Sequence, residues 1–142
     1  MILTIMETIF SKIIAREIPA DIVYEDEVVL AFLDITPVNY GHTLVIPKEP
    51  CVNAFDALPE TLAHMMKIGQ KIARALKAAG LAEGVNLIMN NGAEAGQEVF
   101  HAHLHVVPRL TGDHSFQKPQ HVNVVTEAYQ ETKERLKSAL AE

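Results

Sequence analysis

Short apolar runs recur along this chain of 142 residues, separated by polar or glycine-rich stretches. The runs are rich in β-branched and aromatic residues, which favour strands. They predict strands over 22–24, 28–33, 42–46, 85–89 and 101–107. Glu25-Asp26-Glu27 is the expected hairpin turn between the first two strands. Residues 36–41 and 90–97 are expected to be loops.

Other segments have the 3.6-residue period of helices. A short helix is predicted over 10–15, and Ile18-Pro19 ends it. A long helix is predicted over 58–79, with Pro59 in its first turn and Gly80 after its end. Its apolar positions are Leu58, Leu62, Met65, Met66, Gly69, Ile72, Ala73 and Leu76. Tyr129, Thr132, Leu136 and Leu140 predict a final amphipathic helix.

Hairpin-length links between the strands, with one long helix before the last two, predict an α+β fold with an antiparallel five-stranded sheet. The length fits one domain, and 49% apolar residues are enough for a core. A net charge of −6 with no long basic run argues against general nucleic-acid binding. Cys51 is the only cysteine, which excludes an intrachain disulfide and a cysteine cluster for zinc.

The first six residues are apolar, but Glu7 ends the run early and no basic segment precedes it. We therefore expect neither a signal peptide nor a membrane-spanning helix, and a cytoplasmic protein that does not bind membranes.

The segment His101-Ala102-His103-Leu104-His105 carries the main chemical signal. In a strand, its three imidazoles share one face about 6.6 Å apart, from a rise of about 3.3 Å per residue. In a helix they would diverge. Imidazole acts as a nucleophile, a general acid or base, or a metal ligand, so a zinc site is the main rival interpretation. A strand that carries histidines without a function is the third possibility.

This motif, followed by two apolar residues, resembles the signature of the histidine triad (HIT) nucleotide hydrolases. Four further segments are similar to those of the family: 8–20, 31–37, 41–48 and 90–97. Their order and spacing resemble those of the Hint-like branch from about Thr8 to Pro108.

The resemblance implies a HIT-like fold and one HIT domain over 1–142, with a core of about 8–109 and a C-terminal extension over 110–142 that carries a helix. It implies a homodimer that pairs through the long helix and an edge strand. The expected activity is hydrolysis of purine nucleoside phosphoramidates or related nucleotidyl conjugates through a covalent nucleotidyl-histidine. The product is a nucleoside monophosphate, and no cofactor is required.

By the same resemblance, His103 is the nucleophile. Neutral imidazole is a good nucleophile near pH 7, provided that the other ring nitrogen carries the proton. A backbone carbonyl, such as that of His101, could fix this tautomer. His101 and His105 are expected to bind phosphate oxygens and the leaving group, and His42 matches the family's fourth histidine behind the triad.

The nucleotide-binding residues are also implied by the resemblance. Asp34 would bind the ribose hydroxyls, although it could equally be a turn carboxylate before Thr36. The apolar slot for the base would consist of Phe10, Ile13, Ile18, Phe32 and Ile35, each of which also fits a core position. Asn90, Gly96, Gln97 and Glu98 would flank the phosphate, in a loop that could also be a simple turn.

Two of the departures from the family bear directly on the residues of the site. Glu98 stands where well-known Hint-like enzymes have a serine. A charged carboxylate and a phosphate repel each other, so the resemblance does not identify the leaving group of the substrate. Some bacterial members hold a structural zinc with two cysteines and two histidines. Thr8, Ser11 and Pro50 match three of these ligand positions, so His101 alone remains and no metal is expected.

Two other functions are compatible with the sequence. The protein could be a nucleotide-binding regulator whose hydrolysis is incidental. It could also be a hydrolase with a histidine-bound metal, which would need an open coordination position and a carboxylate base.

Overall fold

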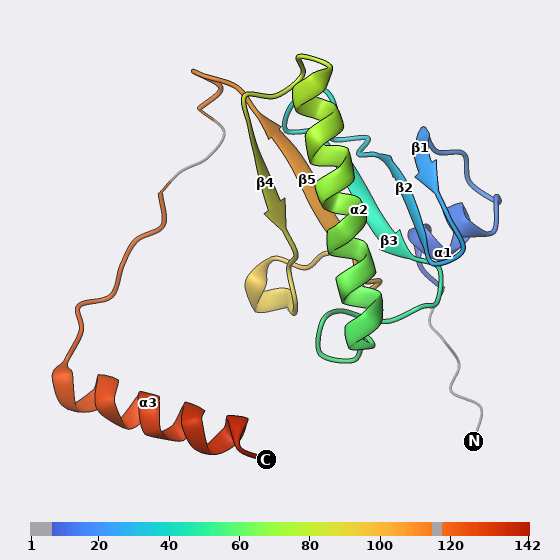
Figure 1. Cartoon of the computed structure of the whole chain (residues 1–142). Helices are drawn as coiled ribbons and strands as arrows, with labels where there is room; N and C mark the ends of the chain where they lie inside the picture. The colour runs from blue at the N-terminus through green and yellow to red at the C-terminus, as the bar shows by residue number, and fades with distance from the viewer. Residues whose placement is uncertain (1–6, 115–117) are drawn as a thin grey trace, which may run out of the picture.

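A computed structural model describes residues 7–114 and 118–142. The apolar run 1–6 and part of the irregular segment expected over 112–120 lie outside the described residues. The elements follow one another along the chain (Figure 1) as α1 (Ile9–Ile14), β1 (Ile22–Glu25), β2 (Val29–Leu33), β3 (Thr43–Pro47), α2 (Pro59–Ala78), β4 (Gly84–Ile88), the short 3-10 helix η1 (Ala93–Ala95), β5 (Leu104–Arg109) and α3 (Thr126–Leu140).

The five strands form one antiparallel sheet in the order β1-β2-β3-β5-β4. The expected α+β fold, with one long helix and a C-terminal helix, is therefore confirmed. β1 and β4 are the edge strands. The connection through α2 leads from β3 to the edge strand β4, and β5 then returns between β3 and β4.

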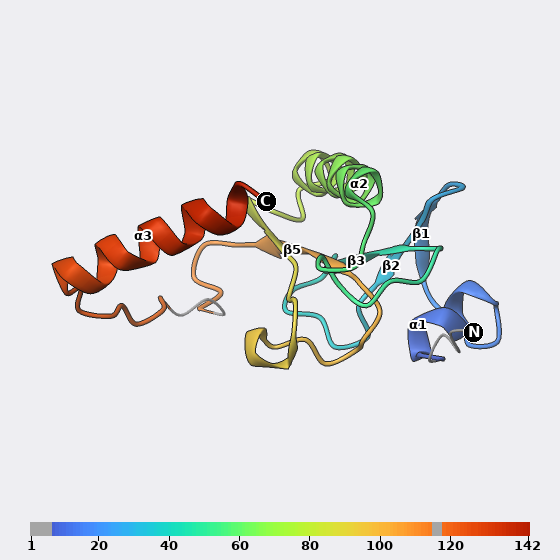
Figure 2. The ribbon, with the colours of Figure 1, turned by 90° about the horizontal axis from the view of Figure 1, so that it is seen from below.

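Helices cover the sheet on both faces, with α2 on one side and α1 on the other (Figure 2). Successive strand residues point to opposite faces, so β2 and β3 divide their side chains between two cores. Val29, Ala31, Val45, Leu104 and Val106 pack under α2. Leu30, Phe32, Leu44 and Ile46 pack under α1 together with Phe10 and Ile13. His105, between Leu104 and Val106, therefore faces the α1 side.

Gly69 allows α2 to lie close to β5. A Cβ atom at this position would be 2.7 Å from Cδ2 of Leu104, and 3.6 and 3.8 Å from atoms of Leu87 and Val106. A larger residue would require either the end of the Leu104 side chain or the helix itself to shift.

The last strand begins later than the sequence predicted. β5 starts at Leu104, so the expectation of a strand over 101–107 is wrong for its first three residues. The β3–β5 ladder ends at the pair Val45–Leu104, because Pro47 has no N–H with which to continue it. The amide of Ala102 instead donates to the carbonyl of Cys51, at 2.8 Å.

The extension after β5 stands apart from the sheet and its helices, with α3 at its end (Figure 1). None of the residues of α3 is buried, and its apolar side chains Tyr129, Leu136 and Leu140 are 63%, 59% and 75% exposed. Within residues 7–114 and 118–142, no helix has the length and apolar character required to cross a membrane.

Candidate active site

A cavity of about 410 Å³ opens on the α1 side of the sheet, between α1, the end of β2 and the loop that follows β4. It brings together eleven of the fourteen residues that the sequence assigned to the site. These are Phe10, Ile13, Ile18, Phe32, Asp34, Ile35, Asn90, Gly96, Glu98, His103 and His105. His42, His101 and Gln97 do not line it.

His103 is held by its backbone neighbour. Its Nδ1 lies 2.8 Å from the carbonyl oxygen of His101, which can only accept, so Nδ1 carries the proton and donates. Nε2 is left unprotonated in the neutral ring. Within the described residues, every buried side-chain nitrogen or oxygen has a hydrogen-bond partner. Nε2 of His103 has no partner among these residues, so it is not buried and opens into the cavity that His103 lines. The expected hydrogen bond from Nδ1 of His103 to the carbonyl of His101 is confirmed.

Aromatic rings fix the plane of His103. The ring of Phe10 meets it edge-on at 5.1 Å, and His105 lies at 5.0 Å on a similar T-shaped contact. The side chain of His103 is 7% exposed, so only a small part of the ring is available to a ligand. These contacts restrict the imidazole to one orientation with Nε2 outward.

His101 lies behind this ring. Its Nε2 donates to the carbonyl of Pro47 at 2.9 Å, and the residue is only 2% exposed. Burial lowers the pKa of His101, with the nearby His103 acting in the same direction. His101 is therefore a neutral, buried ring that sets the backbone on which His103 depends.

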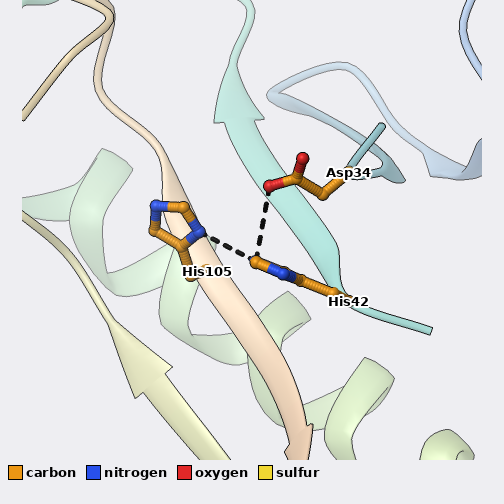
Figure 3. Close-up of side chains that lie close together, drawn as sticks. All are labelled: Asp34, His42 and His105. Atoms are coloured by element: carbon orange, nitrogen blue, oxygen red, sulfur yellow. Dashed lines mark hydrogen bonds and ion pairs between the residues drawn. The ribbon is translucent and has the colours of Figure 1, made fainter. Parts of the chain in front are cut away.

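His42 and His105 form a second hydrogen-bonded pair, with Asp34 beside it (Figure 3). The amide of Val38 donates to Nδ1 of His42 at 3.1 Å, so this nitrogen has the lone pair and Nε2 has the proton. Nε2 of His42 then donates to Nδ1 of His105 at 2.9 Å. The remaining proton of His105 must lie on its Nε2, where it can donate to a bound anion.

The electrostatics of this pair keep both rings neutral near pH 7. Burial lowers the pKa of His42, although the charge of Asp34 opposes the shift. Burial, followed by the charges of His103 and His42, lowers the pKa of His105 to about 4. His105 therefore offers a polar N–H to a ligand rather than a positive charge.

Asp34 makes the turn that the sequence left open as one of its two roles, and the contact with ribose remains a prediction. One carboxylate oxygen accepts from the amide and hydroxyl of Thr36, at 2.9 and 3.1 Å, which makes a turn. The other oxygen lies 3.5 Å from Nε2 of His42. The side chain also lines the cavity, so its free acceptor capacity is available to a ligand.

The loop between β2 and β3 places Asp34 and His42 next to each other. The amide of Asp34 donates to the carbonyl of His42 at 2.8 Å. Gly41 precedes His42 with a φ of +101°, a conformation that favours glycine. Asn39 fastens the loop to the end of β5 by donating to the carbonyl of Pro108 at 2.8 Å.

The apolar part of the cavity lies between α1 and β2. The rings of Phe10 and Phe32 pack edge-on at 5.6 Å, whereas Ile35 is 86% exposed at the rim. Sequence reasoning missed lining residues that neighbour the predicted ones: Ile9, Pro19, Ala20, Leu33, Thr36, Leu44 and Val99. The strand pattern could have predicted Leu44, because Leu44 lies on the same face of the sheet as Phe32, whereas its neighbours Thr43 and Val45 lie on the other face.

Gln97 is the site residue that the structure places elsewhere. Its side chain is 4% exposed and bonds inside the loop, to the amide of Gly92, the carbonyls of Val52 and Val99, and the amide nitrogen of Asn53. These contacts use the hydrogen-bonding groups of the Gln97 side chain, and the expectation that Gln97 flanks the phosphate remains a prediction. Gln97 fixes the loop that carries Asn90, Gly96 and Glu98 along the cavity.

Asp34, His42 and His105 also present one possible metal-ligand atom each, all within 4.8 Å of one another. The hydrogen bonds make this a poor donor set, because Nε2 of His42 carries a proton and Nδ1 of His105 accepts it. A metal would have to displace that proton and separate the two rings. Burial, together with Asp56 and Glu49, raises the pKa of the Cys51 thiol to about 11, which argues against a thiolate ligand or nucleophile.

The positions that match zinc ligands in related bacterial proteins have hydrogen bonds here. Thr8 and Ser11 form a capping box at the start of α1. The Thr8 amide donates to the Ser11 hydroxyl at 2.8 Å, and the Ser11 amide donates to the Thr8 hydroxyl at 3.2 Å. The side chain of His101 is bonded to Pro47. The absence of a structural zinc remains a prediction.

Comparison with known proteins agrees with this geometry. A sequence model of the HIT domain matches residues 15–112, a range that includes His42 and the three triad histidines. The chain is 53% identical over 106 residues to an uncharacterized HIT-like protein of Methanocaldococcus jannaschii, covering 74% of this chain and 81% of that protein.

Two other comparisons extend this similarity to a named enzyme and to a solved structure. The chain is 50% identical over 105 residues to the purine nucleoside phosphoramidase of Escherichia coli K12, covering 71% of this chain and 86% of that protein. The crystal structure of a HIT family protein from Bacillus anthracis is 42% identical in sequence. It matches with a TM-score of 0.83 over 92% of this chain and 95% of that one.

Proposed function

The chain belongs to the HIT family, and we propose that it is a purine nucleotide hydrolase of the Hint-like branch. The proposed substrates are nucleoside phosphoramidates or related nucleotidyl conjugates, and the product is a nucleoside monophosphate. The similarity to the phosphoramidase of Escherichia coli supports the reaction class.

The observation that carries the proposal is the fixed tautomer of His103. A nucleophilic imidazole needs a lone pair directed at the substrate, and the carbonyl of His101 at 2.8 Å holds the proton on the other nitrogen. The ring need not reorient before it attacks. When phosphorus bonds to Nε2 the ring becomes positive, and the same carbonyl lies where it stabilises that charge.

In the first proposed step, the Nε2 lone pair of His103 forms a bond to the α-phosphorus as the phosphorus–nitrogen bond breaks. The bonding pair leaves with the amine, which takes a proton from solvent. In the second step, a water oxygen bonds to phosphorus and the histidine–phosphorus bond breaks. Its electron pair returns to Nε2, and the proton of the water passes to solvent.

The other lining residues support binding of the nucleotide. His105, neutral and protonated on Nε2, would donate to a phosphate oxygen. Asp34 would accept from the ribose hydroxyls, and the apolar side chains between α1 and β2 would cover the base. Few polar groups line that part of the cavity, so burial and stacking would contribute more to binding the base than hydrogen bonds.

A metal-dependent hydrolase is the second candidate, because Asp34, His42 and His105 lie close together. The direction of their hydrogen bonds makes it the weaker proposal. Full turnover after treatment with a chelator would support the histidine nucleophile. A very low turnover number with adenosine phosphoramidate would instead indicate a nucleotide-binding regulator whose hydrolysis is incidental.

Mass spectrometry of enzyme quenched during turnover of adenosine phosphoramidate tests the proposal. A nucleotidyl adduct is expected on the peptide that contains His103. His103→Ala should abolish turnover while adenosine monophosphate still binds. His101→Ala and His105→Ala should each slow turnover by about 10²–10⁴-fold, as expected for supporting groups.

His64→Ala is the matched control, since His64 lies on α2 and bonds to Asp26 outside the cavity. It should retain turnover. An adduct confined to His101 or His105, or near-normal turnover in His103→Ala, would contradict the assignment.

A further inference from the structure

The cavity contains negative charge and no basic side chain. Its described lining residues include two carboxylates, Asp34 and Glu98, but neither lysine nor arginine. Its two lining histidines are His103 and His105, and His105 is neutral near pH 7 because its pKa is lowered to about 4. A phosphate bound here would not meet a strong cation from these residues. Additional negative charge on the substrate would therefore be unfavourable.

Glu98 lines the same cavity as His103 and lies in the loop that follows β4. It follows Gln97, whose buried side chain fixes the loop, and it precedes Val99, which also lines the cavity. Asn90 and Gly96 of the same loop also line the cavity. The nucleoside and the phosphate are common to all the proposed substrates, so a charge in the cavity can discriminate only between their leaving groups.

The carboxylate of Glu98 is exposed, and within residues 7–114 and 118–142 it makes no ion pair. Most other acidic groups near the sheet have a local role: Asp26 bonds to His64 and Glu25 pairs with Arg16 and Lys48. Glu98 has no such structural partner. Its negative charge is thus available to a ligand in the cavity.

We propose that Glu98 selects substrates whose leaving amine carries a positive charge. This inference rests on the proposed function, because it names the substrate class of the same site. The preferred substrates are nucleoside phosphoramidates of amines that have a second, protonated amino group. Conjugates with an anionic leaving group, such as a second phosphate or a carboxylate, are disfavoured by repulsion.

The test compares three adenosine phosphoramidates with leaving groups of similar length: 1,3-diaminopropane, 3-aminopropanol and β-alanine. These groups carry a positive charge, no charge and a negative charge at the far end. The expected order of kcat/KM is cationic, then neutral, then anionic. Each step should be about 1.5- to fivefold, since an exposed ion pair contributes about 0.2–1 kcal/mol. The differences should shrink in 0.5 M salt, which screens exposed charges.

Glu98→Gln removes the charge and keeps nearly the same shape, so the three values should converge to within about twofold. Glu98→Lys should reverse the order. Glu94→Gln is the matched control, because Glu94 is an exposed acid of η1 in the same loop that does not line the cavity. It should preserve the wild-type order.

The outcomes separate the two proposals. If the neutral conjugate is hydrolysed but the wild-type enzyme shows no order with charge, the role of Glu98 is wrong and the proposed function stands. The same conclusion follows if Glu98→Gln keeps the wild-type order. If none of the three conjugates is hydrolysed, the proposed function itself fails.

Discussion

At the scale of single residues, the direction of each hydrogen bond determines what a histidine can do. Two backbone carbonyls accept from His101 and His103, and one backbone amide donates to His42. These three contacts determine which nitrogen is protonated in all four rings, because His42 in turn donates a hydrogen bond to Nδ1 of His105 and leaves the proton of His105 on Nε2. The backbone therefore specifies one nitrogen with a free lone pair and one N–H donor in the cavity.

Replacement of Asp34 tests its proposed contact with ribose. Asp34→Ala should raise KM for adenosine phosphoramidate by about tenfold or more, with a smaller change in kcat, because charge-assisted hydrogen bonds contribute about 1.5–3 kcal/mol. Asp34→Asn keeps an oxygen that can accept from the amide of Thr36, so it separates the charge from the turn. An unchanged KM in a folded Asp34→Ala variant would contradict a ribose contact.

The buried histidines predict how stability depends on pH. The pKa values of His42, His101 and His105 are lowered in the folded state, so the unfolded chain binds more protons below about pH 6.5. The free energy of unfolding should therefore fall as the pH decreases from about 6.5 towards 4, where His105 titrates in the folded protein.

Urea denaturation at pH 7.5, 6.0 and 5.0 measures this dependence above the range in which most carboxylates titrate. His105→Asn should make it shallower, because asparagine can still accept from His42 but does not titrate. Stability that stays constant across these pH values would contradict the burial of neutral rings.

Sequence reasoning identified eleven of the residues that line the cavity, but not all of their contacts. The spacing of His101, His103 and His105 predicted a row of imidazoles, and the resemblance to a family added Asp34 and His42. Gln97 could not be placed in this way. Its role depends on the approach of Val52 and Asn53, which are more than forty positions away and leave no local pattern.

At the scale of elements, the sequence pattern predicted the helices and strands whose positions depend on neighbouring residues in the chain. The strands predicted over 28–33 and 42–46 and the Pro59 start of α2 were confirmed to within one residue, since they depend on local residue type and backbone chemistry. The start of β5 was wrong. Alternating residues do not reveal where the partner strand stops, and here Pro47 of β3 ends the ladder before His103.

The contact between α2 and β5 predicts the effect of a larger residue at Gly69. Gly69→Val should reduce the free energy of unfolding by about 1–3 kcal/mol, although valine has a higher helix propensity than glycine. Gly84→Val is the control, because a Cβ at Gly84 meets no atom within 4 Å. Equal unfolding midpoints for the two variants would show that Leu104 can move aside freely.

At the scale of the whole molecule, one edge of the sheet carries exposed apolar residues. β4 is an edge strand, and Leu87 on β4 and Met66 on α2 are 38% and 48% exposed. An uncovered edge strand with apolar neighbours favours pairing with another chain. These features agree with the homodimer that the family resemblance implies.

Light scattering at micromolar concentration should therefore give twice the chain mass of 15.7 kDa. Met66→Glu should shift the mass towards the monomer, because it places a charge on the apolar surface. A mass of 15.7 kDa for the unmodified protein would contradict the dimer.

The capping box of Thr8 and Ser11 has a consequence for the conditions under which the site stays intact. The start of α1, and with it the position of Phe10 beside His103, is held by hydroxyl groups that neither oxidise readily nor lose an ion. A chelator should therefore leave the melting temperature and nucleotide affinity unchanged. Stoichiometric zinc that survives dialysis against a chelator would contradict this independence from metal supply.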